Sequence, residues 1–147
     1  LVMAESELVD EPKPGKKSRK VGHIKMKVIR DLKASTINEI VEEHVDEGSS
    51  IKSDDSTSYV DLADKVERHE AKVILNKDIE KELPWVHIAI SNAKSWILSN
   101  FHKVNTDYLQ SYLDEYCYNF NRRYMANNLF DRLLVACVTS KNEFRYI

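Results

Sequence analysis

The sequence predicts an α/β fold in which strands form the first part of the chain and helices the second. Residues 23–31 alternate apolar and charged side chains, so that Ile24, Met26 and Val28 share one face of a strand. From Trp85 onward, apolar residues recur at the three- and four-residue spacing of helices. The change of period predicts two parts within one domain.

The first part begins with an antiparallel hairpin. The short apolar segment 1–5 indicates a strand that pairs with residues 23–31. Residues 6–22 between them are polar and contain two of the three Pro and two of the three Gly, which is typical of a long loop. The segment 12–20 of this loop is strongly basic. We therefore expect a basic hairpin loop beside the sheet.

The rest of the first part follows from the same two periods. Ser35 can cap a helix and Gly48 can end it. A short strand then delivers Asp54 and Asp55 to its C-terminal end. The predicted elements are a helix, a strand, a helical turn and a second strand, at residues 35–45, 50–53, 59–62 and 69–75.

Three helices are predicted in the second part, and Asn105 or Thr106 can cap the middle one. Their apolar positions are expected to form core: Ile90, Ala93 and Ile97; Leu109, Tyr112, Leu113, Tyr116 and Phe120; Leu129, Phe130, Leu133, Leu134 and Cys137. Cys117 and Cys137 both fall at such positions, which favours buried free thiols over a disulfide.

Composition is that of an ordinary globular domain, with 147 residues, 42% hydrophobic and 31% charged. No run of about 18 apolar residues occurs, so no membrane span is predicted. The net charge of -2 argues against a simple polyanion-binding domain, but basic residues gather between Lys13 and Lys33 and acidic ones between Glu39 and Asp55. Each block can be a solvated face, and charge alone leaves a nucleic-acid role for the basic block open.

The candidates for chemistry are few. Asp54 and Asp55 at a strand end can hold Mg²⁺, which prefers carboxylate oxygen, or can simply form an Asx turn. Asn92 lies on a predicted helix, where a lone Asn is commonly a surface residue. The sequence has no CxxC or HxxxH pair for zinc, no GxSxG motif, and only three Gly. The residues by themselves therefore predict an α/β domain with a candidate acidic metal site.

The order of elements is compatible with a ribonuclease-H-like fold that lacks its first strand. Five further motifs are informative: VMAE at 2–5, IKMKVIRDLKASTI at 24–37, VDEGSSIKSDD at 45–55, RHEAKVIL at 68–75, and LQSYLDEYCYNFNRR at 109–123. In these motifs the chain resembles the DDE-type transposase domain of the ISXO-like insertion-sequence family, and the last motif is the most specific. The resemblance implies a mixed ribonuclease-H-like sheet flanked by helices, with a helical C-terminal part.

The same resemblance implies a bacterial insertion-sequence transposase that cleaves and transfers DNA strands by two-metal phosphoryl transfer with Mg²⁺ or Mn²⁺. It places the family's second catalytic Asp on Asp54 and its third position on Asn92, both as metal ligands. The Asp-Asp-Asn branch of the family carries a Lys soon after the Asn, as Lys94 does here. Residues expected to contact DNA phosphate are Lys94, Arg122 and Arg123, with Lys16, Lys17, Arg19 and Lys20 of the loop; for Arg122 and Arg123 a helix-end charge is the alternative.

The implied partners are transposon ends and target DNA, bound by a homo-oligomer in the bacterial cytoplasm, at the nucleoid and without a membrane. One catalytic-type domain is expected over residues 1–147, with a sheet part at 1–83 and C-terminal helices at 84–147.

Three departures from the family matter, and the first is Asn92, which stands where most such transposases carry Glu. Asp55 stands where a Gly is usual, and the family's first catalytic Asp lies on a strand before Leu1, so Glu5, Glu7 and Asp10 come one strand too late to replace it. The start in an apolar run suggests a fragment, inactive alone. The alternative is an inactive transposase remnant that acts as a DNA-binding or interaction module, and whether the chain is an enzyme stays open.

Overall fold

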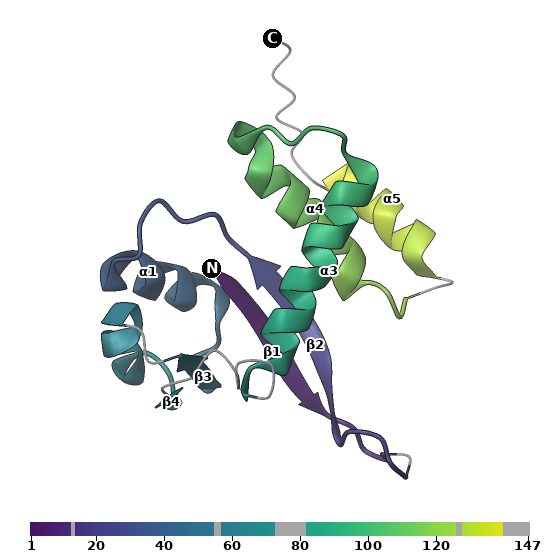
Figure 1. Cartoon of the computed structure of the whole chain (residues 1–147). Helices are drawn as coiled ribbons and strands as arrows, with labels where there is room; N and C mark the ends of the chain where they lie inside the picture. The colour runs from purple at the N-terminus through teal and green to yellow at the C-terminus, as the bar shows by residue number, and fades with distance from the viewer. Residues whose placement is uncertain (13, 55–56, 73–81, 126–127, 140–147) are drawn as a thin grey trace.

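The computed structural model describes residues 1–12, 14–54, 57–72, 82–125 and 128–139 and confirms the α/β class (Figure 1). Asp55 and the end of the predicted strand 69–75 lie outside these residues. The elements, with η for 3₁₀ turns, are β1 (Val2–Leu8), β2 (Arg19–Met26), α1 (Ala34–His44), β3 (Ser50–Asp54), η1 (Thr57–Asp64), β4 (Arg68–Lys72), α3 (Pro84–Asn100), η2 (Thr106–Tyr108), α4 (Leu109–Asn121) and α5 (Leu129–Thr139).

β1 and β2 form the expected antiparallel hairpin, but its paired residues lie nearer the turn than predicted. β2 ends at Met26 and not at residue 31, so Val28, predicted on the buried face, lies beyond the strand and is exposed. Leu8 pairs with Arg19 and Glu7 with Lys20, so the strands extend into residues that we expected in the loop. Polar residues can extend the ladder here because they pair across it: the Lys20 ammonium lies 3.1 Å from the Glu7 carboxylate. The connection shrinks from the expected 6–22 to residues 9–18.

β3 and β4 form a second, parallel sheet, in which Ser50 lies opposite Arg68 and Asp54 opposite Lys72. Among the described residues, the strands thus form two two-stranded sheets, one antiparallel and one parallel. In Figure 1 α3 crosses the hairpin, while α1 lies on the side of β3 and β4. The arrangement divides the chain into a hairpin unit, made of β1, β2, α3 and α4, and a parallel unit, made of α1, β3, η1 and β4.

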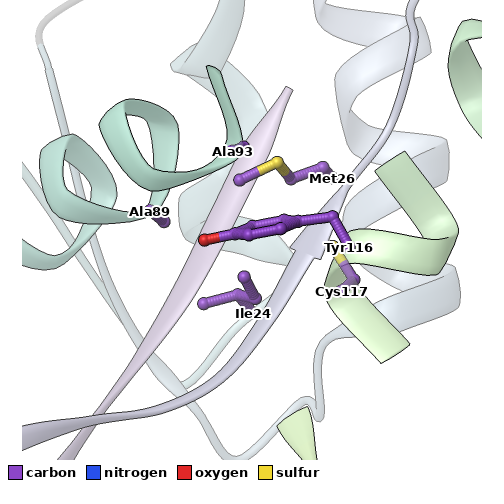
Figure 2. Close-up of a cluster of buried hydrophobic side chains, with 6 residues drawn as sticks. All are labelled: Ile24, Met26, Ala89, Ala93, Tyr116 and Cys117. Atoms are coloured by element: carbon purple, nitrogen blue, oxygen red, sulfur yellow. The ribbon is translucent and has the colours of Figure 1, made fainter. Parts of the chain in front are cut away.

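The core of the hairpin unit lies between the strands and the two helices. Ile24 and Met26 of β2 pack against Ala89 and Ala93 of α3 and against Tyr116 of α4 (Figure 2). Small alanines let α3 approach the strands closely, and the Tyr116 ring fills the remaining space. The core positions predicted for α4 are confirmed at Tyr116, with Leu113 and Phe120 packed against the cluster. For α3 the prediction is only partly right, because Ala93 is buried but Ile90 and Ile97 are only half-buried, and Ala89 lies in the core instead.

A second core holds the parallel unit together. Ile37 and Val41 of α1 pack with Leu62 and Val66, and the hairpin reaches this core through Leu1, which packs against it together with Ile29. The predicted cap at Ser35 is wrong, because α1 begins at Ala34. A carboxylate oxygen of Asp31, just before the helix, accepts two hydrogen bonds, from the Thr36 hydroxyl at 2.7 Å and from the Lys33 amide at 3.2 Å.

Side-chain amides from α4 cover the outer edge of β2. Asn121 accepts from the Ile24 amide at 2.8 Å and donates to the Ile24 carbonyl at 2.9 Å. Gln110 accepts from the Val28 amide at 2.8 Å and donates to the Met26 carbonyl at 3.1 Å. These two amides satisfy backbone groups that a neighbouring strand would otherwise pair, so this edge is closed.

The cysteines and α5 differ from expectation. Cys117 is buried, and burial raises the pKa of its thiol. Cys137 is free but exposed, because α5 has no buried residue; its predicted core positions are therefore wrong.

Candidate functional site

Asp54 ends β3 with an exposed side chain. Its neighbour in space is Tyr59 of η1, whose pKa is raised by burial and then by the negative charge of Asp54. Behind it, the buried Ser53 hydroxyl donates to the Asp54 carbonyl at 2.9 Å and lies 2.8 Å from Nε2 of His69 on β4. The Ser53 hydroxyl has one hydrogen, which it donates to the Asp54 carbonyl, so the His69 ring must donate to the Ser53 oxygen. These two hydrogen bonds hold the end of β3 against β4.

The partner of Asp54 in the ladder, Lys72, connects this strand end to the start of the helical part. Lys72 donates to the Glu82 carboxylate, and this hydrogen bond lowers the pKa of Glu82. Glu82 stands two residues before Pro84, the first residue of α3. The charged end of the parallel sheet is thereby joined to the helix that carries Asn92.

Asn92 and Lys94 are exposed on α3. α3 packs against β1 and α4, and within the described residues no hydrogen bond or ion pair joins it to β3. The structure therefore places Asp54 and Asn92 on different units, and among the described residues no hydrogen bond joins them. Their shared metal-binding role stays a prediction.

The two arginines after α4 make structural contacts. Arg123 donates to the Val21 carbonyl at 2.6 Å and to the Phe120 carbonyl at 2.8 Å, and its guanidinium lies 4.0 Å from the Phe120 ring centre. Arg122 lies 3.6 Å from the Tyr118 ring centre. Arg123 thus extends the cover over β2, and a contact with DNA stays a prediction for both residues.

The basic loop lies close to the beginning of α3. Lys16 and Lys17 are exposed, and the Lys17 ammonium lies 5.4 Å from the Trp85 ring centre. Arg19 donates to Ser6, and Lys20 pairs with Glu7, so these two cations are partly engaged by β1. Among the described cations of the loop, Lys16 and Lys17 form no ion pair, and their contact with DNA stays a prediction.

One cluster was missed by the sequence reasoning. Glu5, Glu7 and His23 bring their ligand atoms within 4.8 Å of one another, and the His23 amide donates to Glu5 at 2.9 Å. A Cβ on Gly22 would lie 2.4 Å from a Glu7 oxygen and 2.5 Å from a Glu5 oxygen, so the two carboxylates occupy the space that a side chain at this position would take. The sequence feature that could have revealed this cluster is a pair of acidic residues two apart on one strand, with a His on the strand that pairs with it. Lys20 forms an ion pair with Glu7, and Nδ1 of His23 lies 3.0 Å from a Glu5 carboxylate oxygen.

Comparison with known families decides the classification. The family model described as the ISXO2-like transposase domain matches residues 1–121. The chain belongs to this family. The ISXO2-like match covers both sheets, Asp54, Asn92 and all of α4, and it ends before Arg122 and α5. Among curated proteins and solved structures, no significant match is found. Within the described residues, no helix is both long and apolar enough to cross a membrane.

Proposed function

We propose that this transposase domain contributes to DNA strand cleavage and strand transfer during movement of a bacterial insertion sequence, in the cytoplasm at the nucleoid. The observation that carries the proposal is Asp54, an exposed carboxylate at the C-terminal end of a parallel strand within the family match. In α/β sheets, ligands bind at the carboxyl ends of strands. Transposon ends and target DNA are the substrates that the family membership supports.

The two sheets support a ribonuclease-H-like arrangement interrupted at its centre. Leu1 and Lys27 exchange both backbone hydrogen bonds, at 2.8 and 2.9 Å, so Val2 and Ala4 direct their backbone groups away from β2. The opposite edge of the hairpin is already closed by α4. A further strand between β1 and β3 would join the two sheets into one mixed sheet and would carry the first catalytic Asp.

The residues present fit part of a metal site. Asp54 offers a carboxylate to a hard cation and Asn92 a neutral carbonyl oxygen. Among the described residues no group of three ligands surrounds Asp54, and the family's first catalytic Asp would add a further carboxylate. Two Mg²⁺ or Mn²⁺ ions, when bound, would activate the attacking oxygen and stabilise the leaving oxygen. Asp54 would hold the metal, Asn92 would ligate or orient it, and Lys94, Lys16 and Lys17 would bind phosphate.

The test is Mg²⁺-dependent cleavage of transposon-end DNA by the chain extended with the residues encoded upstream. Asp54→Asn keeps the shape of the side chain but removes its charge, and the cleavage rate should fall roughly 10³-fold. Asp64→Asn, at an exposed acid of η1, is the matched control and should cleave normally. Equal cleavage by the Asp54 variant would refute the assignment.

A remnant that binds DNA without cleaving it is the second candidate, favoured by the neutral Asn92 and by the exposed Lys16 and Lys17. Binding through phosphate contacts weakens as salt rises, because counterions are released. Replacing both lysines with Ala should reduce the slope of log affinity against log salt by about 2. Salt-sensitive binding with no cleavage by the extended chain would select this candidate over the first.

A further inference from the structure

The last helix has the character of an interface rather than of a solvated surface. Among the described α-helices, α5 alone has no buried residue, and ten of its eleven residues are exposed. Yet residues 133–139 contain no charged side chain, and the two charges of α5 are confined to Asp131 and Arg132. Charged residues are similarly rare at the centre of protein interfaces.

The apolar side chains of α5 form a continuous stripe. Phe130, Leu134 and Val138 follow one another at four-residue spacing and are 67%, 49% and 84% exposed. Leu133 and Val135 widen the stripe and are also exposed. The exposed fractions correspond to roughly 600 Å² of apolar surface on one short helix, at the upper limit for the largest patch of a typical monomer.

We propose that α5 pairs with α5 of a second copy of this chain, in antiparallel orientation about a two-fold axis at Leu134. The stripe is suited to this symmetry because Leu134 is its midpoint. The axis brings each Leu134 beside its own copy and sets the large Phe130 at the height of the smaller Val138 of the other chain, which evens the packing. Antiparallel helices also align their dipoles favourably.

The size of the surface indicates a reversible dimer. A standard stable interface removes about 800 Å² from each partner, somewhat more than α5 alone can supply. Self-association in the micromolar range is therefore expected. α5 lies across the molecule from β3 and β4 (Figure 1), so the paired state leaves the Asp54 end of the parallel sheet accessible.

The inference deepens the oligomer expected of the proposed function, but it does not depend on catalysis. A chain that dimerises and cleaves no DNA would contradict the proposed function and leave the interface standing. A chain whose extended form cleaves DNA while α5 variants dimerise normally would do the opposite.

Sedimentation velocity of the intact chain, from about 1 to 200 µM, measures the association. Leu134→Glu places two like charges beside each other at the axis and should weaken the dimer at least tenfold. Leu134→Lys should do the same. An equimolar mixture of the two variants pairs opposite charges and should recover dimer that neither forms alone. The control is Leu98→Glu, at a 79% exposed leucine of α3 outside the stripe, which should dimerise like the parent chain.

Three results would overturn the proposal: a parent chain that stays monomeric at 200 µM, a Leu134→Glu variant that dimerises like the parent, or a Glu and Lys mixture no more associated than its components. Since Leu134 is exposed, neither substitution should unfold the chain. Circular dichroism checks this, and Val138→Glu provides a second disruption of the same stripe if Leu134 variants lose helix.

Discussion

The hairpin unit and the parallel unit are stabilised in different ways. In the hairpin unit, Asn121 and Gln110 bind the backbone of an edge strand directly, in addition to an apolar core. The parallel unit has its own apolar core, but the described side chains provide no comparable cover for β4, where only His69 is half-buried. A two-stranded parallel sheet with such exposure is unusual, because parallel strands are normally covered on both faces.

The contacts of α4 give the sequence motif at residues 109–123 a structural role. Apolar residues of this segment, such as Tyr116 and Phe120, contribute to the core. Its polar residues Gln110, Asn121 and Arg123 instead bind main-chain atoms of residues 21–28. These contacts close one side of the hairpin, and the strand proposed above would add at its other side, at β1. The motif thus has a structural part in holding the hairpin.

Removing the Asn121 amide should disturb the hairpin unit most. Asn121→Ala leaves the amide and carbonyl of the buried Ile24 unpaired, and the free energy of unfolding should fall by about 2–4 kcal/mol. Urea denaturation measures the change. Asn119→Ala, at an exposed position two residues earlier, should cost less than about 0.5 kcal/mol. Equal effects of the two substitutions would show that the bonds to Ile24 do not stabilise the unit.

Arg123 tests the same cover with a smaller expected effect. Arg123→Met keeps much of the apolar stem but loses the bonds to the Val21 and Phe120 carbonyls, and should cost about 1–3 kcal/mol of unfolding free energy. Arg132→Met, at an exposed residue of α5, should change stability little. If Arg123→Met instead leaves stability unchanged and flattens the salt dependence of DNA binding, Arg123 is a phosphate contact.

The Tyr116 hydroxyl is a polar group inside the hairpin core. Its buried hydroxyl has no hydrogen-bond partner among the described residues, points to the Ala89 side in Figure 2, and has its pKa raised by burial. Tyr116→Phe should therefore be neutral or stabilise the chain by up to about 1 kcal/mol. Thermal or urea unfolding measures this. A loss above about 1 kcal/mol would reveal a partner for the hydroxyl.

The smallest effect concerns Glu5. Hydrogen bonds from the backbone and then the ring of His23 lower the pKa of Glu5 below its usual 4.5. A lowered pKa in the folded state means that this contribution to stability is complete above pH 4.5 and is lost as pH falls through the folded-state value. Because Glu5 is half exposed, the effect should stay below about 0.5 kcal/mol. As pH is lowered from 6 to 3, the urea midpoint should fall less steeply for Glu5→Gln than for Glu11→Gln, the exposed control.

The sequence allowed prediction of the element order, the hairpin and the strand that delivers Asp54, because each depends on local period or local hydrogen bonding. Of the two predicted caps, Asn105 does cap, but it caps the η2 turn before α4 and not α4 itself. It did not reveal the Asn121 contact with Ile24, which joins residues 97 positions apart. The burial predicted for α5 failed because helical spacing reveals an apolar face but not whether anything packs against it. The relation of Asp54 to Asn92 depends on how the two units are joined, which no local pattern encodes.

The central claim is that β1 and β3 flank the position of a strand that carries the first catalytic Asp. Amide hydrogen exchange at Val2 and Ala4 tests it most directly, with Met3, already paired with Lys25 in the hairpin, as internal reference. The account predicts rapid exchange at Val2 and Ala4 in this chain and at least about 100-fold slower exchange when the upstream residues are present, since a ladder bond then protects each amide. Unchanged, rapid exchange at both amides in the extended chain would contradict it.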